Sequence, residues 1–253
     1  MKLSLLFQSL EDLGAEVLHF HRDGAVYSLD FFEPAAKSCE VPALTKAEES
    51  SEPCYSDLLK DNFDYIREKV NSGEGKSICV GDLFTIPHLK VPAVNCEGEE
   101  FDEIDLKDVV IRIVHVEPRR VVFNFEDILF RHDIDYEESG KPFEETPLGV
   151  YLAKHFSDAL KEHIGKVKAT LLTLDNVFNE ESKDFMPYFK PIKNRIKVLA
   201  FENDTWWWWL KTPTASNATY FCGVDYNGNS NYGGASDADG GVSPAFEFTA
   251  DSE

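Results

Sequence analysis

The sequence predicts an α+β fold built on antiparallel β-sheet. Runs of β-branched and aromatic residues, bounded by Gly, Asp and Pro, fill residues 78–130. Strand patterns return after residue 204, and the helical patterns of this part of the chain lie between the two groups of strands. Helices that are grouped together and flanked by paired strands are typical of an α+β fold rather than of alternating βαβ units.

The first 75 residues predict a small N-terminal α+β region. Residues 3–13 have the pattern of a short amphipathic helix, and residues 16–32 alternate around Asp23-Gly24, which predicts a hairpin. Residues 33–53 are rich in Glu, Ser, Ala and Pro without periodicity, which indicates a linker. A helix with one apolar face is predicted from residue 55. We assign residues 1–75 to attachment or oligomerisation, and residues 76–253 to the main domain.

The main domain begins with three predicted strands, in residues 77–87, 108–118 and 119–130. The last two are expected to form a hairpin around Pro118 to Arg120. A helix over residues 146–165 follows, with Thr146 as its N-cap and Pro147 at its first position. Residues 169–178 predict a strand that runs into a short helix.

Composition excludes several classes of function. The chain has 253 residues and a formal net charge of −21, which repels phosphate backbones and anionic membrane surfaces. We therefore expect no nucleic-acid and no membrane partner. No apolar run approaches the roughly 20 residues of a membrane span, and the N-terminus lacks the pattern of a signal peptide. The expectation is a soluble, acidic protein of the cytoplasm or of a phage particle.

The sequence argues against a zinc site, a disulfide framework and a nucleotide-binding P-loop. The five cysteines form no C-x-x-C pair, so we interpret them as reduced thiols rather than as zinc ligands or a disulfide framework.

GEGKS at residues 73–77 resembles the end of a P-loop. Val70 stands where the first glycine of that motif belongs, and a helix rather than a strand precedes it. We predict no nucleotide binding there.

All four tryptophans stand in a row, at residues 206–209. On a strand, Trp207 and Trp209 point to one side, and Trp206 and Trp208 point to the other. The stretch is therefore a strand buried on both faces, or a core strand whose second face lines a ligand groove. Under the second interpretation Trp206 and Trp208 are candidate binding residues, because exposed aromatic rings stack on sugars or anchor proteins.

The segment after the tryptophans has the composition of an adaptable binding surface. Tyrosine provides contact area at low entropic cost, and asparagine provides hydrogen bonds. The alternative is a glycine-rich hairpin in which Asn227-Gly228 merely satisfies turn geometry. The candidate ligand-binding residues are Asn217, Tyr220, Tyr226, Asn227, Asn229, Asn231 and Tyr232.

Asp225, Asn227 and Asn229, followed by Asp237 and Asp239, carry the oxygen atoms that calcium prefers. The EF-hand spacing is broken, because Ser230 and Ser236 stand where its Gly and Glu belong. We favour solvated turn acids, and no cofactor, over calcium.

Several sequence blocks, in order, resemble the domain of unknown function 6273 family, which is common in gut bacteria and their phages. They are VGDLFT from Val80, VYLAKHF from Val150, LLTLDNVF from Leu171, WWLKTP from Trp208 and GVSPAF from Gly241. The resemblance covers about residues 76–248. The ending is also similar to that of C-type-lectin-like domains. Lys211 and Ser243 replace two arginines of the family pattern.

The resemblance implies a C-type-lectin-like antiparallel sheet domain with one or two flanking helices. It implies a non-enzymatic module whose loop-hairpin surface binds a protein or a glycan, in a phage or as an effector. The alternatives are an enzyme of the formylglycine-generating branch, which needs paired cysteines, and a scaffold without a ligand. Cys222 has no cysteine near it in sequence, and no catalytic motif stands out. Assembly into a homo-oligomer remains open.

Overall fold

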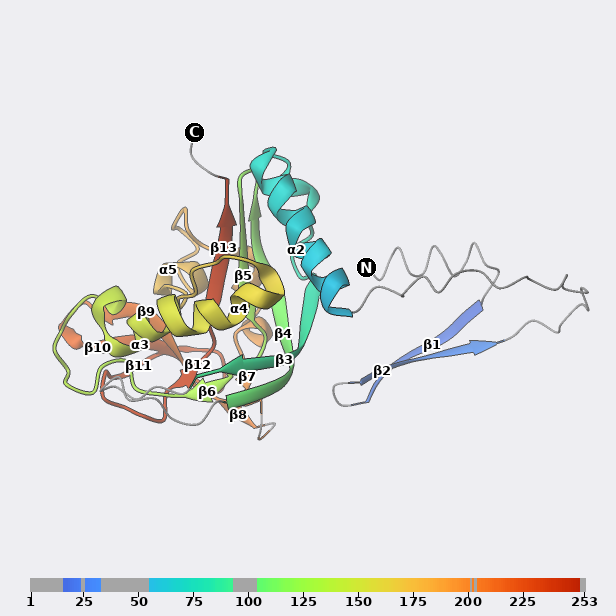
Figure 1. Ribbon diagram of the computed structural model, residues 1–253. Helices are drawn as coiled ribbons and strands as arrows, with labels where there is room; N and C mark the ends of the chain where they lie inside the picture. The colour runs from blue at the N-terminus through green and yellow to red at the C-terminus, as the bar shows by residue number, and fades with distance from the viewer. Residues whose placement is uncertain are drawn as a thin grey trace, which may run out of the picture. The chain divides into compact units, whose positions relative to one another are not determined.

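The computed structural model describes residues 16–23, 26–32, 55–92, 104–200, 202 and 204–250, with side chains described from residue 61 onward. The chain forms two compact units, Met1–Pro53 and Cys54–Glu253. In the first unit, β1 (Glu16–Asp23) and β2 (Val26–Phe32) pair antiparallel (Figure 1), which confirms the predicted hairpin. The helix predicted over residues 3–13 lies outside the described residues.

The helix α2 (Tyr55–Asn71) belongs to the second unit. Phe63, Ile66 and Val70, the apolar face that the periodicity predicts, are buried in the main hydrophobic core. The two compact units divide between Pro53 and Cys54, so α2 lies in the same unit as the sheets that follow it. Periodicity reveals that a helix has an apolar face, but it does not reveal which unit covers that face.

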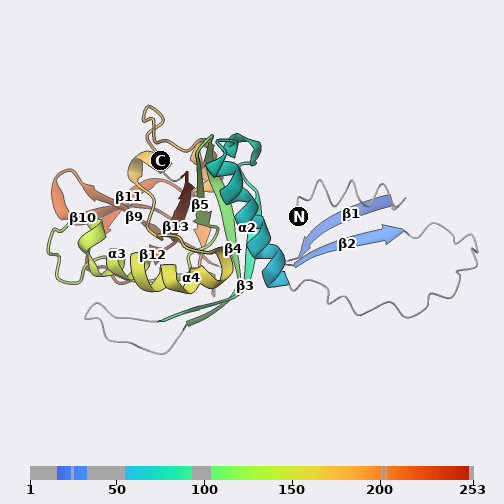
Figure 2. The same ribbon diagram turned by 45° about the horizontal axis from the view of Figure 1, so that its top comes forward.

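A four-stranded antiparallel sheet organises the second unit, in the order β13-β5-β4-β3. The β4–β5 hairpin turns at Pro118 and Arg119, as predicted, with Glu117 paired to Arg120. Helix α2 lies along one face of this sheet (Figure 2). The strands are β3 (Leu83–Val91), β4 (Ile104–Glu117), β5 (Arg120–Phe125) and β13 (Ala245–Thr249).

A five-stranded sheet has the order β11-β10-β9-β12-β6, and β7 and β8 form a separate pair. All pairs are antiparallel except β12 with β9. The unit is thus mixed α+β with mostly antiparallel sheets, as predicted at that level. The strands are β6 (Phe130–Arg131), β7 (Lys197–Val198), β8 (Thr205–Trp206), β9 (Trp208–Thr214), β10 (Asn217–Val224), β11 (Ser230–Gly234) and β12 (Gly241–Val242).

The predicted central helix forms, but it is interrupted by a π-helical segment. Thr146 Oγ1 accepts a hydrogen bond from the Gly149 N–H, and Gly165 ends the helix at φ 77°. In between, the Ser157 hydroxyl donates to the carbonyl of Leu152 five residues earlier. The parts are α3 (Pro147–Tyr151), the π segment Leu152–Phe156 and α4 (Ser157–Ile164), and α5 (Leu174–Val177) follows. Short 3-10 helices span Gly75–Ser77, Phe143–Glu145, Pro187–Phe189 and Ile192–Asn194.

The glycines of GEGKS have packing roles. Gly73 ends α2 at φ 77°, in the region that favours glycine. A Cβ on Gly75 would lie 2.2 Å from the carbonyl oxygen of Glu117, and the Gly75 N–H donates to the carbonyl of Pro118. This segment therefore packs against the β4–β5 turn.

Two hydrophobic clusters lie on opposite sides of the sheets. The helix-side cluster joins α2 and α4 to the four-stranded sheet, and includes Phe63, Leu160, Phe123 and Phe246. The loop-side cluster packs Val122 and Ala245 against the irregular segment 170–199, and includes Leu172, Met186 and Phe189. Side chains alternate along a strand, so β4, β5 and β13 contribute to both clusters, whereas the buried residues of β3 lie in the helix-side cluster.

Candidate functional site

The four tryptophans span the end of one strand and the start of the next: Trp206 ends β8, Trp208 and Trp209 begin β9, and Trp207 lies between the two strands. Trp209 is fully buried in the helix-side cluster, and Trp207 packs against it edge-on, with ring centroids 4.6 Å apart. Trp208 is fully buried in the loop-side cluster, against which Trp206 packs. Leu210, the next residue of β9, is fully buried as well.

Three of the indole N–H groups are paired with backbone carbonyls, as buried indoles require. Trp206 donates to Asp239 at 2.8 Å, Trp208 to Arg195 at 2.9 Å and Trp209 to His132 at 2.9 Å. The prediction that Trp208 lines a ligand surface is wrong, because no part of it is exposed. Trp206 is half-buried, with the Arg131 guanidinium 5.4 Å from the centroid of its ring.

The β10–β11 hairpin presents exposed tyrosines. Tyr220, Tyr226 and Tyr232 are 38%, 60% and 65% exposed. The rings of Tyr220 and Tyr232 lie side by side on neighbouring strands, with centroids 6.1 Å apart. The asparagines predicted to accompany them are all exposed: Asn217, Asn227, Asn229 and Asn231. The structure thus brings these predicted residues together on one hairpin.

The hairpin turn is organised by Asp225. Its carboxylate accepts the N–H groups of Asn227 and Asn229, each at 2.8 Å, and Gly228 has a φ of 83°. Partial burial tends to raise the pKa of Asp225, but these bound N–H groups hold the pKa below its ordinary value. The carboxylate that would begin a calcium site is therefore engaged in closing the turn. Among the described residues, no group of three or more His, Cys, Asp or Glu side chains is arranged to hold a metal.

Burial of β10 differs from the expected pattern. The sequence predicts that Phe221 and Val224 cannot both enter the core without a bulge at Gly223. The pairing with β9 does shift register between Phe221 and Gly223. However, Phe221 lies in the helix-side cluster while Cys222 and Val224 lie in the loop-side cluster. Both faces of β10 are covered by hydrophobic clusters. Phe221 and Val224 therefore point to opposite faces and are both buried, without any need for a bulge.

Two isoleucines beside the turn escaped the sequence analysis. Ile192 and Ile196 are exposed, and Gly228 packs so closely that a Cβ there would lie 2.9 Å from Ile192 Cγ1 and 3.3 Å from Ile196 Cγ1. Their segment has no periodicity that would place them at the hairpin. We use the term hairpin surface for these two isoleucines and the exposed hairpin residues: Asn217, Tyr220, Tyr226, Asn227, Asn229, Asn231 and Tyr232.

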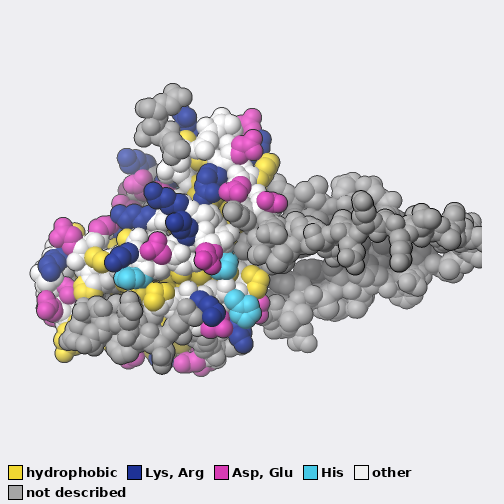
Figure 3. Space-filling model, viewed as in Figure 1, with side chains coloured by type: hydrophobic (Ala, Val, Ile, Leu, Met, Phe, Trp, Pro, Cys, Tyr) yellow, Lys and Arg dark blue, Asp and Glu magenta, His cyan; other side chains and the backbone are white. Residues whose placement is uncertain are grey.

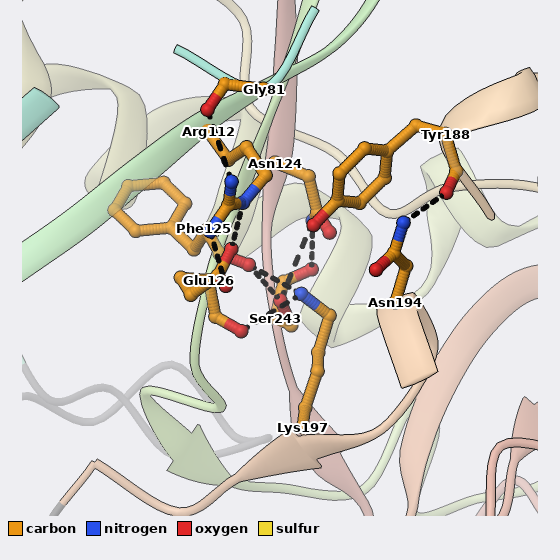
Figure 4. Close-up of polar contacts among 9 residues, drawn as sticks. All are labelled: Gly81, Arg112, Asn124, Phe125, Glu126, Tyr188, Asn194, Lys197 and Ser243. Atoms are coloured by element: carbon orange, nitrogen blue, oxygen red, sulfur yellow. Dashed lines mark hydrogen bonds and ion pairs between the residues drawn. The ribbon is translucent and has the colours of Figure 1, made fainter. Parts of the chain in front are cut away.

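A buried polar cluster ties β5 to the C-terminal strands (Figure 4). The Lys197 ammonium donates to the carbonyls of Phe125 at 2.5 Å and Glu126 at 3.1 Å, and Ser243 Oγ donates to the same Phe125 carbonyl. Asn124 Nδ2 donates to the carbonyl of Pro244 at 2.8 Å. Burial lowers the pKa of Lys197 to about 8, although Glu126 and Asp127 oppose the shift. Lys197, Asn124 and Ser243 are all buried, so we interpret the cluster as structural.

Lys211 and Ser243, which replace two arginines of the family pattern, lie on a strand and between two paired strands, respectively, at the C-terminal end of the chain. Lys211, on β9, forms an ion pair with Glu144 at 3.2 Å. Ser243 lies between β12 and β13, where its hydroxyl bonds to the Phe125 carbonyl that also accepts from Lys197. Both strands that flank Ser243 are regularly paired.

The family model described as "Domain of unknown function (DUF6273)" matches residues 165–249. This range begins at the end of α4 and includes the tryptophan strand, the β10–β11 hairpin and β13. No curated protein and no solved structure matches the chain. None of the helices in the described part of the chain has the length and apolar character to cross a membrane.

Proposed function

We propose that this chain, whose residues 165–249 belong to the DUF6273 family, is a non-enzymatic ligand-binding protein that presents the hairpin surface to a protein or a glycan. The observation that carries the proposal is the exposure of Tyr220, Tyr226 and Tyr232 on one short hairpin. Exposed tyrosines among asparagines are typical of surfaces that bind by aromatic contact and adaptable hydrogen bonds.

The support under the hairpin favours the same function. Strand β10 pairs with β9, whose Trp208, Trp209 and Leu210 are fully buried. Binding residues on a rigid scaffold lose little conformational freedom when a ligand binds. We also propose that the second unit has the C-type-lectin-like fold that the resemblance implies. Its support is the combination of a WWL core strand with an exposed hairpin directly after it.

An enzymatic role of the formylglycine-generating type has less support. That chemistry requires a reactive cysteine pair, and Cys222 is buried in the loop-side cluster. Burial raises the pKa of the Cys222 thiol, which disfavours the reactive thiolate.

The test is a binding screen of the purified chain against glycan and protein arrays, with and without calcium. A quadruple variant, Tyr226→Ala, Asn229→Ser, Asn231→Ser and Tyr232→Ala, is then compared with the parent for each hit. We expect the variant to lose binding while its free energy of unfolding stays within about 1 kcal/mol of the parent value, because all four side chains are exposed.

The matched control is Tyr65→Ala, which removes an exposed tyrosine from α2. It should bind like the parent. Hits that bind the quadruple variant as well as the parent would exclude the hairpin surface as the site. A quadruple variant that unfolds would show instead that the hairpin residues serve the fold.

A further inference from the structure

A groove runs beside the outer edge of β13, which is the edge strand of the four-stranded sheet. It has a volume of about 740 Å³ and is lined by residues of β13 and of its neighbour β5, by Lys168 and residues 170–176, and by Glu144, Asp184, Met186, Lys211 and Thr212. It shares no lining residue with the hairpin surface. Figure 3 shows lysine and arginine side chains interspersed with acidic ones over the face on which β13 and α5 lie.

The hydrogen bonds of β13 show which of its backbone groups face outward. The Pro244 carbonyl accepts from Phe125, and the Ala250 N–H donates to Arg119, so the even-numbered residues face β5. Ala245 faces the other way, because its N–H and carbonyl both bond to Thr170, at 2.7 Å and 2.8 Å. By the same alternation, the N–H and carbonyl groups of Glu247 and Thr249 point outward from the sheet.

Among the residues that the structure describes, these outward groups have no backbone partner. Thr170 is the one residue that bridges to this edge within the described part of the chain, and its bridge stops at Ala245. Glu247 and Thr249 are exposed and line the groove. Unpaired N–H and carbonyl groups in a row on an edge strand form a template for another extended chain.

We propose that this edge of β13 binds an extended peptide, which adds to the sheet as a further strand next to Thr170. The unpaired backbone groups select an extended chain, because only such a chain matches their spacing. Two ionic side chains in the groove wall favour a peptide with charged residues. Lys168 and Asp184 are exposed there, and the described residues provide neither with an ion pair. The acidic neighbours Glu144 and Glu247 form ion pairs with Lys211 and Arg120. Lys168 also lies close enough to Glu144 to help lower the pKa of that carboxyl group, but it forms no ion pair with it.

The probe is a blocked heptapeptide in which valine and lysine alternate, since valine favours extended backbone and lysine is attracted by the net charge of −21. Amide exchange is followed by NMR. At saturating peptide, exchange of the Glu247 and Thr249 amides should slow by about tenfold or more, whereas the Phe246 and Phe248 amides, already bonded to β5, should change little. A fully N-methylated analogue has the same charge but cannot donate hydrogen bonds, and should not slow exchange.

The chain offers a matched pair of variants at the edge. Thr249→Pro removes an outward N–H while leaving the bonds to β5 in place, and Thr249→Val keeps that N–H. We expect Thr249→Pro to weaken peptide binding by about tenfold relative to Thr249→Val. The unfolding midpoints of the two variants should agree, which confirms that both fold.

Three results would overturn the proposal. The first is unchanged exchange at Glu247 and Thr249 with saturating peptide. The second is equal binding of the N-methylated analogue, which would assign the attraction to charge alone. The third is protection of this edge without peptide that grows with protein concentration, which would assign the edge to a second copy of the chain.

Discussion

Trp208 and Trp209 are consecutive residues and both are fully buried, yet they lie in different hydrophobic clusters. The strand that carries them separates the helix-side cluster from the loop-side cluster. A run of tryptophans is therefore compatible with regular strand geometry, because each face of the strand has its own core to fill.

Replacing either tryptophan by alanine should be strongly destabilising. We expect Trp208→Ala and Trp209→Ala each to lower the free energy of unfolding by about 3–5 kcal/mol, through the cavity left and the backbone carbonyl left unpaired. Urea denaturation measures the effect, with Tyr65→Ala on the exposed side of α2 as the control. If both variants unfold at the parent concentration of urea, the assignment of this strand to the core is wrong.

Gly240 is expected to tolerate no side chain. A Cβ at this position would lie 1.8 Å from Trp209 Nε1, the atom that donates to the His132 carbonyl. We expect Gly240→Ala to destabilise the chain by about 1–3 kcal/mol, as overpacking does.

Gly234→Ala is the matched control, since the nearest atom to a Cβ there is 3.5 Å away. We compare the thermal unfolding midpoints of the two variants. A lower midpoint for Gly240→Ala than for Gly234→Ala would show that the loss comes from the clash with Trp209 and not from replacing a glycine as such. Equal midpoints would contradict the close approach of Gly240 to the indole.

Lys197 should make stability depend on pH. Its pKa falls from an ordinary 10.5 to about 8 in the fold, because burial disfavours the charged form. Between these values the unfolded chain binds the proton that the folded chain has lost, so stability rises with pH. Below about pH 8 both states are protonated, and the full cost of burying the charge remains.

The slope from one such group is at most about 1.4 kcal/mol per pH unit. Cys222 and Tyr188 limit the window, because burial raises the pKa of the thiol above its ordinary 9.0 and the pKa of Tyr188 from 10.0 to about 12. Above about pH 9 the unfolded thiol ionises first, which lowers stability. Above about pH 10 the unfolded tyrosine ionises first, which lowers stability. Urea denaturation between about pH 8 and pH 9 should show the rise in the parent and in Lys211→Met, whose lysine is half-buried and paired with Glu144, but not in Lys197→Met. A slope that persists in Lys197→Met would assign it to another group.

The GEGKS segment should not bind nucleotides. Gly75 packs against the carbonyls of Glu117 and Pro118, and the preceding element is the helix α2. We expect Lys76→Ala to leave a titration with ATP and magnesium as flat as that of the parent. Saturable, magnesium-dependent binding that Lys76→Ala abolishes would contradict this.

The sequence by itself determined the local elements. Asp23-Gly24, Pro118-Arg119 and Asn227-Gly228 identify three of the hairpins, since turn chemistry depends on a few adjacent residues. The apolar face of α2 and the Thr146 cap were also readable, because helix periodicity and capping are local. The exposure of Asn229, Asn231 and Tyr232 follows from the absence of apolar neighbours in the sequence.

Only the tertiary structure decided which faces are covered. Alternation divides Trp206 and Trp208 from Trp207 and Trp209, but it cannot reveal that the irregular segment 170–199 packs over the second face. For the same reason α2 joins the second unit, and Ile192 and Ile196 arrive at the hairpin turn. Such contacts join residues far apart in sequence, and their free energy comes from the surface that both partners remove from water, which no local pattern records.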